Sequence, residues 1–394
     1  MKTYGIEGAK IDPISGEPFI GTIVVVDGKI SAVGENIQIP EGAERLDGTG
    51  KFLMPGFIDA HTHIGLYPEA MGWAGEDYNE KSGPITPQVD AIDSIYADDI
   101  AFSETLAGGV TTVMITPGSA NVVGGQCVVL KTRSRNLVTE MLIRRHAGLK
   151  IAFGENPRRI YGNQGKMPTT RMGVAALLRE TLQKAVEYRN KQRQSEDWQG
   201  PVDFGMEAIG RVIAGDMPLR AHAHRADDIA TAIRIAKEFD LEIVIEHATE
   251  GDKIVDLLVE EDVPVIVGPT MTFRSKMEVK DRDFVTLAKL EKAGARFSIT
   301  SDHPVVPCGY LPLYAGIAVR HGLSEKAALE AITIQPAKVL GVDDRVGSIE
   351  VGKDADLVLW NGHPFSGMSK PDWVMVDGVL NRVDEQVRLT SWED

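Results

Sequence analysis

The chain has 394 residues, of which 43% are hydrophobic and 25% are charged, and its formal net charge is −15. These values are typical of a globular protein with one large and one small domain, or with two ordinary ones. The negative charge argues against nucleic acid or an anionic membrane surface as a partner. Cys127 and Cys308 are the only cysteines, which excludes a disulfide framework and a thiolate zinc knuckle.

The first residues lack a charged segment followed by a long apolar core, so we expect no secretory signal. No stretch reaches the roughly 18 consecutive apolar residues that a membrane span needs. We therefore expect a cytoplasmic protein that binds neither membrane nor nucleic acid. We further expect a homo-oligomer that acts on a small molecule.

The N-terminal segment is predicted to consist of short strands and turns. Two apolar runs, residues 22–26 and 29–33, flank Asp27-Gly28. An Asp-Gly pair between such runs is a strong hairpin signal. An isolated two-stranded hairpin is marginally stable in water, so these strands need partners.

The C-terminal segment shows the same pattern in residues 355–360 and 373–376, the latter followed by Asp377-Gly378. The economical arrangement pairs the two ends of the chain. We therefore predict a small composite β-sandwich domain made of residues 1–54 and 345–394. Residues 55–344 would form a second domain inserted between them.

The inserted segment alternates short apolar strands with stretches of helical length. Residues 226–239, for example, place Ile229 and Ile233 at core spacing and precede an apolar run. This alternation predicts parallel β/α units, and eight strands are the number that a (β/α)8 TIM barrel needs. The third and fourth strands are poorly defined, which leaves a doubly wound open sheet as an alternative. The eight predicted strands end near His63, Thr116, Leu130, Glu155, His224, His247, Pro269 and Asp302.

Two histidines close the first predicted strand of the barrel. His61 and His63 are two residues apart, so their side chains leave a strand on the same face. Other metal-type ligands close later strands, namely His222, His247 and Asp302. The carboxyl ends of parallel barrel strands share one mouth, so these side chains should converge. Such a donor set suits one or two divalent ions, Zn²⁺ first and Mn²⁺ or Fe²⁺ as alternatives.

Further polar residues are predicted to lie at the mouth. Glu155 closes the fourth strand and is our candidate to bridge two ions. Lys150 and Lys131 are its rivals if one of them is carboxylated, although Lys150 lies five residues before the predicted strand end. His224 is a substrate contact, a ligand or a structural residue. His303 follows Asp302 directly and is a candidate substrate contact.

Two motifs together resemble the metal-dependent amidohydrolase superfamily, and within it the imidazolonepropionase-like branch. The motifs are residues 54–63, Met-Pro-Gly-Phe-Ile-Asp-Ala-His-Thr-His, and residues 347–358, Gly-Ser-Ile-Glu-Val-Gly-Lys-Asp-Ala-Asp-Leu-Val. The resemblance covers nearly the whole chain and implies a metal-bearing barrel with a composite domain from both ends. It assigns His61 and His63 to the first-strand ligands. His222, His247 and Asp302 match those of the fifth, sixth and eighth strands. The fourth-strand lysine that many members carboxylate has no clear match, because Glu155 stands near that place.

A metal-activated water and a proton-transferring Asp302 predict a hydrolase of a C–N bond. Its substrate would be a cyclic amide, an N-acyl amino acid or a small peptide. The alternatives are a deaminase of a heterocycle and a non-catalytic barrel that serves as a scaffold. Arginines in the mouth loops favour a substrate with a carboxylate. The candidate substrate-binding residues are His224, Arg158, Tyr161, Arg225 and His303.

Overall fold

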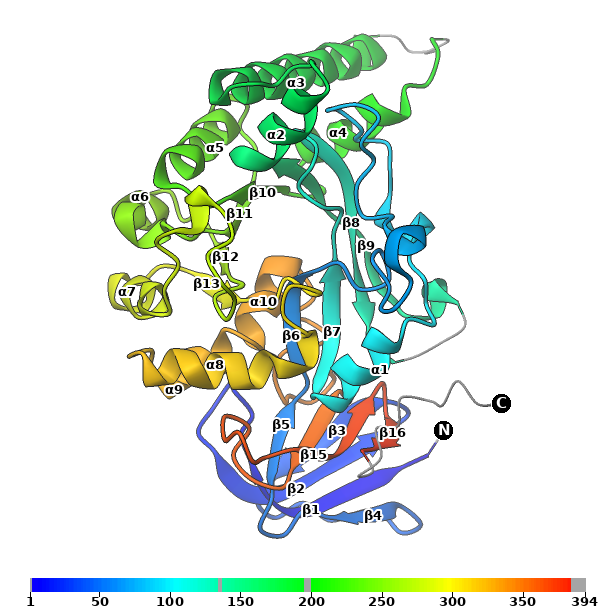
Figure 1. The fold of residues 1–394 in the computed structure, drawn as a ribbon. Helices are drawn as coiled ribbons and strands as arrows, with labels where there is room; N and C mark the ends of the chain where they lie inside the picture. The colour runs from blue at the N-terminus through cyan, green and yellow to red at the C-terminus, as the bar shows by residue number, and fades with distance from the viewer. Residues whose placement is uncertain (1, 134–136, 195–199, 384–394) are drawn as a thin grey trace.

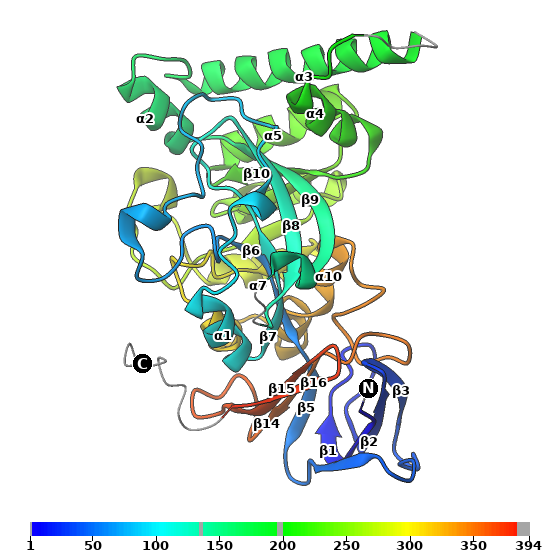
Figure 2. The same cartoon turned by 90° about the vertical axis from the view of Figure 1, so that its right-hand side faces the viewer.

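The computed structural model describes residues 2–133, 137–194 and 200–383 (Figure 1). It contains two eight-stranded sheets, one formed by strands from both ends of the chain and one by the central segment. The terminal sheet lies beneath the barrel in the views of Figures 1 and 2. None of the described helices is long and apolar enough to cross a membrane.

The terminal sheet has the strand order β16-β15-β14-β5-β1-β2-β3, and β4 pairs with β1. Its N-terminal and C-terminal halves meet where β5 and β14 run antiparallel. Both predicted Asp-Gly hairpins are present, between β2 and β3 and between β15 and β16. Its strands are β1 (Tyr4–Ile11), β2 (Phe19–Val26), β3 (Lys29–Gly34), β4 (Glu44–Asp47), β5 (Phe52–Pro55), β14 (Leu357–Trp360), β15 (Pro371–Val376) and β16 (Val379–Arg382).

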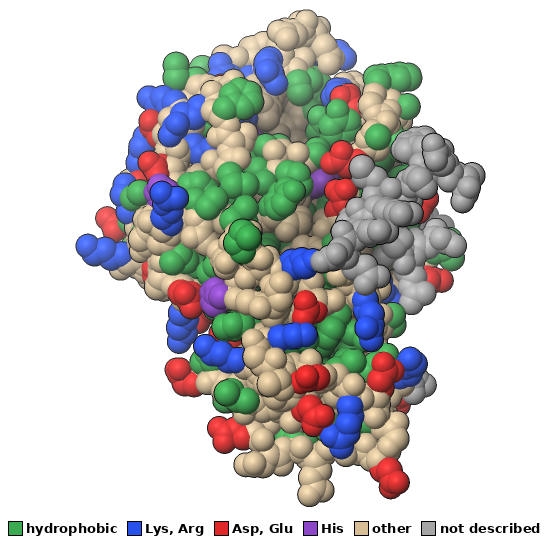
Figure 3. All heavy atoms as spheres, turned by 60° about the horizontal axis from the view of Figure 1, so that its bottom comes forward, with side chains coloured by type: hydrophobic (Ala, Val, Ile, Leu, Met, Phe, Trp, Pro, Cys, Tyr) green, Lys and Arg blue, Asp and Glu red, His purple; other side chains and the backbone are tan. Residues whose placement is uncertain are grey.

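The prediction that the two ends pair is therefore confirmed at the level of the sheet. The finer prediction, a separate composite sandwich domain with a boundary at residues 54 and 345, stays a prediction. Residues 384–394 of that predicted domain lie outside the described residues. On the face in Figure 3, acidic and basic side chains are interspersed over the lower part, and hydrophobic ones gather across the middle.

The second sheet is a nearly closed barrel whose strands follow in chain order from β6 to β13. Its two ends meet just beyond the first and last strands, where the backbone N–H of His63 donates to the carbonyl oxygen of His303 at 2.9 Å. This sequential order excludes the doubly wound alternative. The barrel strands are β6 (Phe57–Thr62), β7 (Val110–Ile115), β8 (Val123–Lys131), β9 (Leu142–Ala152), β10 (Leu219–Ala223), β11 (Ile243–His247), β12 (Val265–Val267) and β13 (Phe297–Ile299).

One strand departs from the predicted parallel barrel, because β8 runs antiparallel to both β7 and β9. The chain between β7 and β8, residues 116–122, carries no helix. A parallel pair needs a crossover of about a dozen residues or more, so this connection is too short for one. The reversal turns the end of β8, with Lys131, away from the mouth and towards the terminal sheet.

Helices cover the barrel from outside and close one end of it. Ser324 caps α9 as predicted, since its side chain accepts from the backbone N–H of Ala327. Ala337 and Leu340 of α10 belong to the apolar cluster that fills the barrel with Ile58 and Val244, so α10 covers the end where the parallel strands begin. The helices are α1 (Ile100–Ala107), α2 (Glu155–Asn163), α3 (Arg171–Gln194), α4 (Phe204–Ala214), α5 (Ala226–Glu238), α6 (Val255–Glu260), α7 (Val285–Ala293), α8 (Leu311–Arg320), α9 (Glu325–Glu330) and α10 (Ile334–Leu340).

Candidate metal centre

The barrel brings together side chains at the ends of β6 and β13 or just after them. Nε2 of His61 and Nε2 of His63 both lie 3.4 Å from Oδ1 of Asp302. Nδ1 of His63 is fixed by the carbonyl oxygen of Thr116 at 2.7 Å. Each histidine therefore directs its Nε2 towards the carboxylate, as the alternation along a strand predicts.

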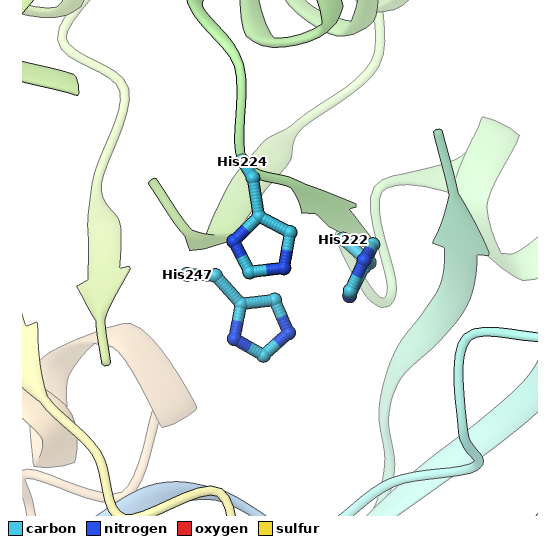
Figure 4. A group of neighbouring side chains, drawn as sticks. All are labelled: His222, His224 and His247. Carbon is cyan, nitrogen blue, oxygen red and sulfur yellow. The ribbon is translucent and has the colours of Figure 1, made fainter. Parts of the chain in front are cut away.

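A second group comes from β10 and β11. The rings of His224 and His247 are stacked, with centroids 4.8 Å apart, and His222 stands edge-on to His247 at 4.5 Å (Figure 4). Nδ1 of His247 lies 2.8 Å from the carbonyl oxygen of Gly268, and Nδ1 of His224 lies 2.8 Å from Oγ1 of Thr249. These bonds leave Nε2 of both rings free to face the centre.

Two of these residues have strained backbones. His247 has φ 74° and Asp302 has φ 53°, although neither is glycine. Positive φ costs a residue with a Cβ of order 1–3 kcal/mol and is concentrated at functional sites. Here the turn brings His247 into the mouth together with Glu246, the residue before it, whereas a regular strand would point the two side chains to opposite faces.

Burial sets the charge states of these groups. It lowers the pKa of His222 to about 4 and holds the pKa values of His224 and His247 well below the usual range. These imidazoles are neutral near pH 7 and keep a lone pair for a ligand bond. Burial acts to raise the pKa of Asp302, but its close contacts with His61 and His63 outweigh burial and hold that pKa well below its usual range.

The donor set fits a divalent cation. Two groups of ligand atoms, His222 with His224 and His247, and His61 with His247 and Asp302, each lie within 4.8 Å of one another. Both ring nitrogens of His222 are buried and have no hydrogen-bond partner among the described residues. Imidazoles with one carboxylate suit Zn²⁺, and also Mn²⁺ or Fe²⁺. The two groups share His247, so they are adjacent parts of one centre.

The sequence-based placement of Glu155 needs correction. Strand β9 ends at Ala152, and Glu155 begins α2, where its Oε1 accepts from the backbone N–H of Glu278 at 3.2 Å. Lys150, two residues before the end of β9, is buried, and its Nζ lies 3.4 Å from Nε2 of His61. Lys150 is thus beside the centre, because the strand is shorter at this end than its apolar run indicated.

The sequence-based prediction did not include two buried carboxylates that lie beside the histidines. Oε2 of Glu246 lies 2.8 Å from Nδ1 of His61, and its Oε1 lies 2.5 Å from Nε of Arg220. Oε1 of Glu278 lies 3.9 Å from Nε2 of both His222 and His224. Glu246 could have been identified from the sequence, because it stands directly before His247 in an otherwise apolar strand. Glu278 lies in a short 3-10 helix, Met277–Val279, whose sequence shows no pattern, so no signal pointed to it.

One of the predicted substrate-binding residues lies in a ligand group, and the others do not. His224 lies in the second histidine group. Arg225 forms two hydrogen bonds with the carboxylate of Asp227, and Nε of Arg158 donates to the carbonyl oxygen of Thr169. Both arginines therefore have local partners, and neither belongs to the two ligand groups.

The other two residues also lie outside those groups. The hydroxyl of Tyr161 lies 2.7 Å from the carbonyl oxygen of Gly83 and 2.9 Å from Oδ1 of Asn121, so it fixes a loop. Nδ1 of His303 accepts from the backbone N–H of Cys308, and the residue lines a recess with Glu104 and Tyr310.

A family model described as the amidohydrolase family matches residues 206–380. A solved structure of an amidohydrolase from Thermotoga maritima MSB8 is 48% identical and has a TM-score of 0.94. The similarity covers 96% of this chain and all of that one.

Two curated proteins are more distant. Amidohydrolase tasK of Hapsidospora irregularis is 28% identical over 95% of this chain, which spans 41% of the length of tasK. The imidazolonepropionase of Cupriavidus taiwanensis is 26% identical, over 86% of this chain and 84% of its own length.

Proposed function

Because the chain belongs to the amidohydrolase family, we propose that it is a metal-dependent hydrolase that cleaves a C–N bond of a small molecule. The substrate is a cyclic amide, an N-acyl amino acid or a small peptide. One observation carries the proposal. Ligand atoms of His61 in β6, His247 in β11 and Asp302 in the turn after β13 lie within 4.8 Å of one another.

Each of five strand ends supplies at least one of the proposed metal ligands. A bound divalent ion supplies a water of lowered pKa and polarises a carbonyl group. Zn²⁺ is the ion we favour, because imidazole nitrogen predominates among the ligands. The proposed ligands are His61, His63, Lys150, His222, His247 and Asp302.

Lys150 replaces Glu155 as the proposed bridge. Burial lowers the pKa of the Lys150 amine, which favours its neutral form. A neutral amine can add to carbon dioxide, forming a C–N bond and releasing a proton, and the product is a carbamate with two oxygen donors. This chemistry requires a lysine at the mouth, where Nζ of Lys150 lies beside His61.

Asp302 is the proposed proton carrier. Its low pKa keeps the carboxylate ionised near pH 7, so it can accept a proton from the attacking water. It then returns the proton to the departing nitrogen, which leaves poorly as an anion. We assign His224 a contact with the substrate, since Thr249 fixes its ring beside His247.

The test combines metal analysis with a substrate panel. The protein is loaded with Zn²⁺, Mn²⁺ or Fe²⁺ and assayed against N-acyl amino acids, dipeptides, cyclic amides and aminopurines. We expect retained metal, and hydrolysis that leaves a new carboxylate. His61→Ala and His247→Ala should lose both metal and turnover. Asp302→Asn should keep metal and lose roughly 100-fold or more in kcat.

The outcomes separate this proposal from its rivals. Ammonia release from an aminopurine without a new carboxylate would make the protein a deaminase. A protein that retains no metal, and whose properties do not respond to a chelator, would be a scaffold. Normal turnover in Asp302→Asn would remove that residue from proton transfer.

A further inference from the structure

Asp59 is a fully buried carboxylate in β6, two residues before His61. In the part of the chain that the structure describes, it forms no ion pair with a lysine or an arginine. Burying a carboxylate without a counter-ion is costly unless hydrogen-bond donors surround it. The stabilisation of this carboxylate therefore comes from its donors, and their positions indicate its role.

The donors to Asp59 come from two segments of the candidate metal centre. Oδ1 of Asp59 accepts from the backbone N–H of His61 at 3.1 Å. Oδ2 accepts from the backbone N–H of Ser301 at 2.9 Å and from the Ser301 hydroxyl at 2.5 Å. The two carboxylate oxygens thus join the strand that carries His61 to the turn that carries Asp302.

Thr300 extends this network to Asp302. The hydroxyl oxygen of Thr300 lies 2.6 Å from Oδ1 of Asp59 and 2.7 Å from the carbonyl oxygen of His61, and its single proton serves one of these acceptors. The same oxygen accepts from the backbone N–H of Asp302 at 3.2 Å. Asp59 is therefore connected to the backbone of the residue that we propose as proton carrier.

The backbone of Asp302 requires such support. Its φ is 53°, in the left-handed region, where a residue with a Cβ remains only when its surroundings hold it there. A change of this φ would move the carboxylate relative to His61 and His63, whose Nε2 atoms both lie 3.4 Å from Oδ1 of Asp302. The hydrogen bonds between Asp59 and the segment 300–301 oppose that change.

We propose that Asp59 is a positioning residue, whose carboxylate fixes His61 and Asp302 in the arrangement that binds the metal ion. The inference rests on the proposed function, which requires that ion. A carboxylate is needed, because its two oxygens accept from two backbone N–H groups, those of His61 and Ser301. An asparagine has a single amide oxygen, so in either orientation one of these N–H groups faces an NH₂ donor. Each orientation therefore releases one side of the centre.

Metal affinity is the quantity to measure, because it depends neither on turnover nor on the choice of substrate. The metal-free protein is titrated with Co²⁺, whose visible absorption reports the geometry of its ligands. We expect Asp59→Asn to bind Co²⁺ roughly 10- to 100-fold more weakly, the usual effect of losing a residue that orients metal ligands. The absorption band should also change in intensity. Urea unfolding of the metal-free proteins shows whether each variant is folded.

Two substitutions of Thr300 provide a second test, which stays valid if Asp59→Asn does not fold. Thr300→Val keeps the shape of the side chain but removes its hydroxyl, so it should also weaken Co²⁺ binding. Thr300→Ser keeps the hydroxyl and should retain the affinity. Because Asp59 and Thr300 belong to one network, the effects of Asp59→Asn and Thr300→Val should not add in the double variant.

Asp99→Asn is the matched control. Asp99 is buried as well, and its carboxylate accepts from the backbone N–H groups of Gly65, Glu69 and Ala101. No hydrogen bond among the described residues joins Asp99 to the turn that carries Asp302. This variant should therefore bind Co²⁺ as the unaltered protein does.

The outcomes distinguish this inference from the proposed function. Unchanged Co²⁺ affinity and absorption in folded Asp59→Asn, or in folded Thr300→Val, would overturn the inference and leave the proposed function standing. An equal loss of affinity in Asp99→Asn would also overturn it, because any buried carboxylate would then have the same effect. A lack of Co²⁺ binding in the unaltered protein would overturn both.

Discussion

The candidate metal centre depends on residues outside its proposed ligand set. Glu246 is fully buried and joins Nδ1 of His61 to the guanidinium of Arg220. Burial acts to raise the pKa of Glu246, but Arg220 and His61 outweigh it and lower that pKa to about 2. A carboxylate that stays ionised fixes the tautomer of His61, with its proton on Nδ1 and the lone pair of Nε2 towards the centre.

Glu246→Gln should therefore weaken zinc binding by about 10- to 100-fold, the usual effect of losing such a carboxylate. Competition with a chromophoric chelator measures the affinity. Glu242→Gln, at an exposed position just before β11, should leave it unchanged. Urea unfolding of the metal-free proteins separates a loss of affinity from a loss of fold. Unaltered affinity in a folded Glu246→Gln would show that Glu246 does not orient His61.

A second prediction concerns the proposed carbamate of Lys150. If its amine forms a carbamate, metal uptake by the metal-free protein should increase with added bicarbonate. Lys150→Met should bind less metal and lose the bicarbonate dependence. Lys131→Met, at the other end of the barrel, should retain it. Bicarbonate-independent uptake in the unaltered protein would exclude the carbamate.

At the scale of elements, the reversed strand β8 determines what Lys131 does. Its Nζ lies 3.1 Å from Oδ2 of Asp354, 2.5 Å from Oδ2 of Asp356 and 3.3 Å from Oδ1 of Asp377. Burial acts to lower the pKa of Lys131, but Asp356 and its neighbours outweigh burial and raise it. Lys131 thus joins the barrel to the terminal sheet as a buried cation among carboxylates.

Lys131→Met should lower the free energy of unfolding by about 3–5 kcal/mol, because it leaves buried carboxylates unpaired. Zinc content of the folded variant should not change. Lys29→Gln is the control, since Lys29 contacts the same Asp354 but is 51% exposed. That change should cost less than about 1 kcal/mol. Urea titrations provide both values. Loss of zinc from folded Lys131→Met would instead place Lys131 near the metal centre.

At the scale of the whole molecule, the proposed ligands come from β6, β9, β10 and β11 and from the turn after β13. A metal ion bound by them would connect opposite sides of the barrel, so it stabilises the folded state by mass action. The predicted cytoplasmic location and homo-oligomeric state remain predictions.

Removing the metal with 1,10-phenanthroline should lower Tm, and adding zinc back should restore it. At a free metal concentration of 1,000 times Kd the stabilisation is about 4 kcal/mol. Scanning calorimetry measures the shift. His247 is the ligand common to the two groups of ligand atoms. The Tm of His247→Ala should therefore change little when the chelator is added. An equal shift in His247→Ala would mean that the stabilising metal binds elsewhere.

The sequence alone determined the features that arise from local pattern. Apolar runs predicted the eight barrel strands, Asp-Gly pairs predicted the two hairpins, and spacing predicted that His61 and His63 share a face. These features depend on backbone preference and side-chain alternation, which neighbouring residues decide.

Only the tertiary structure decided the direction of β8, the place of Lys150 and the partners of the mouth arginines. The last two depend on residues distant in sequence, and the first depends on a connection whose ends only the structure defined. Lys131 contacts carboxylates more than two hundred positions away, and Glu278 lies near His222 although its short 3-10 helix shows no periodicity. A buried charge takes whichever partner the fold brings near it, and no local pattern records that partner.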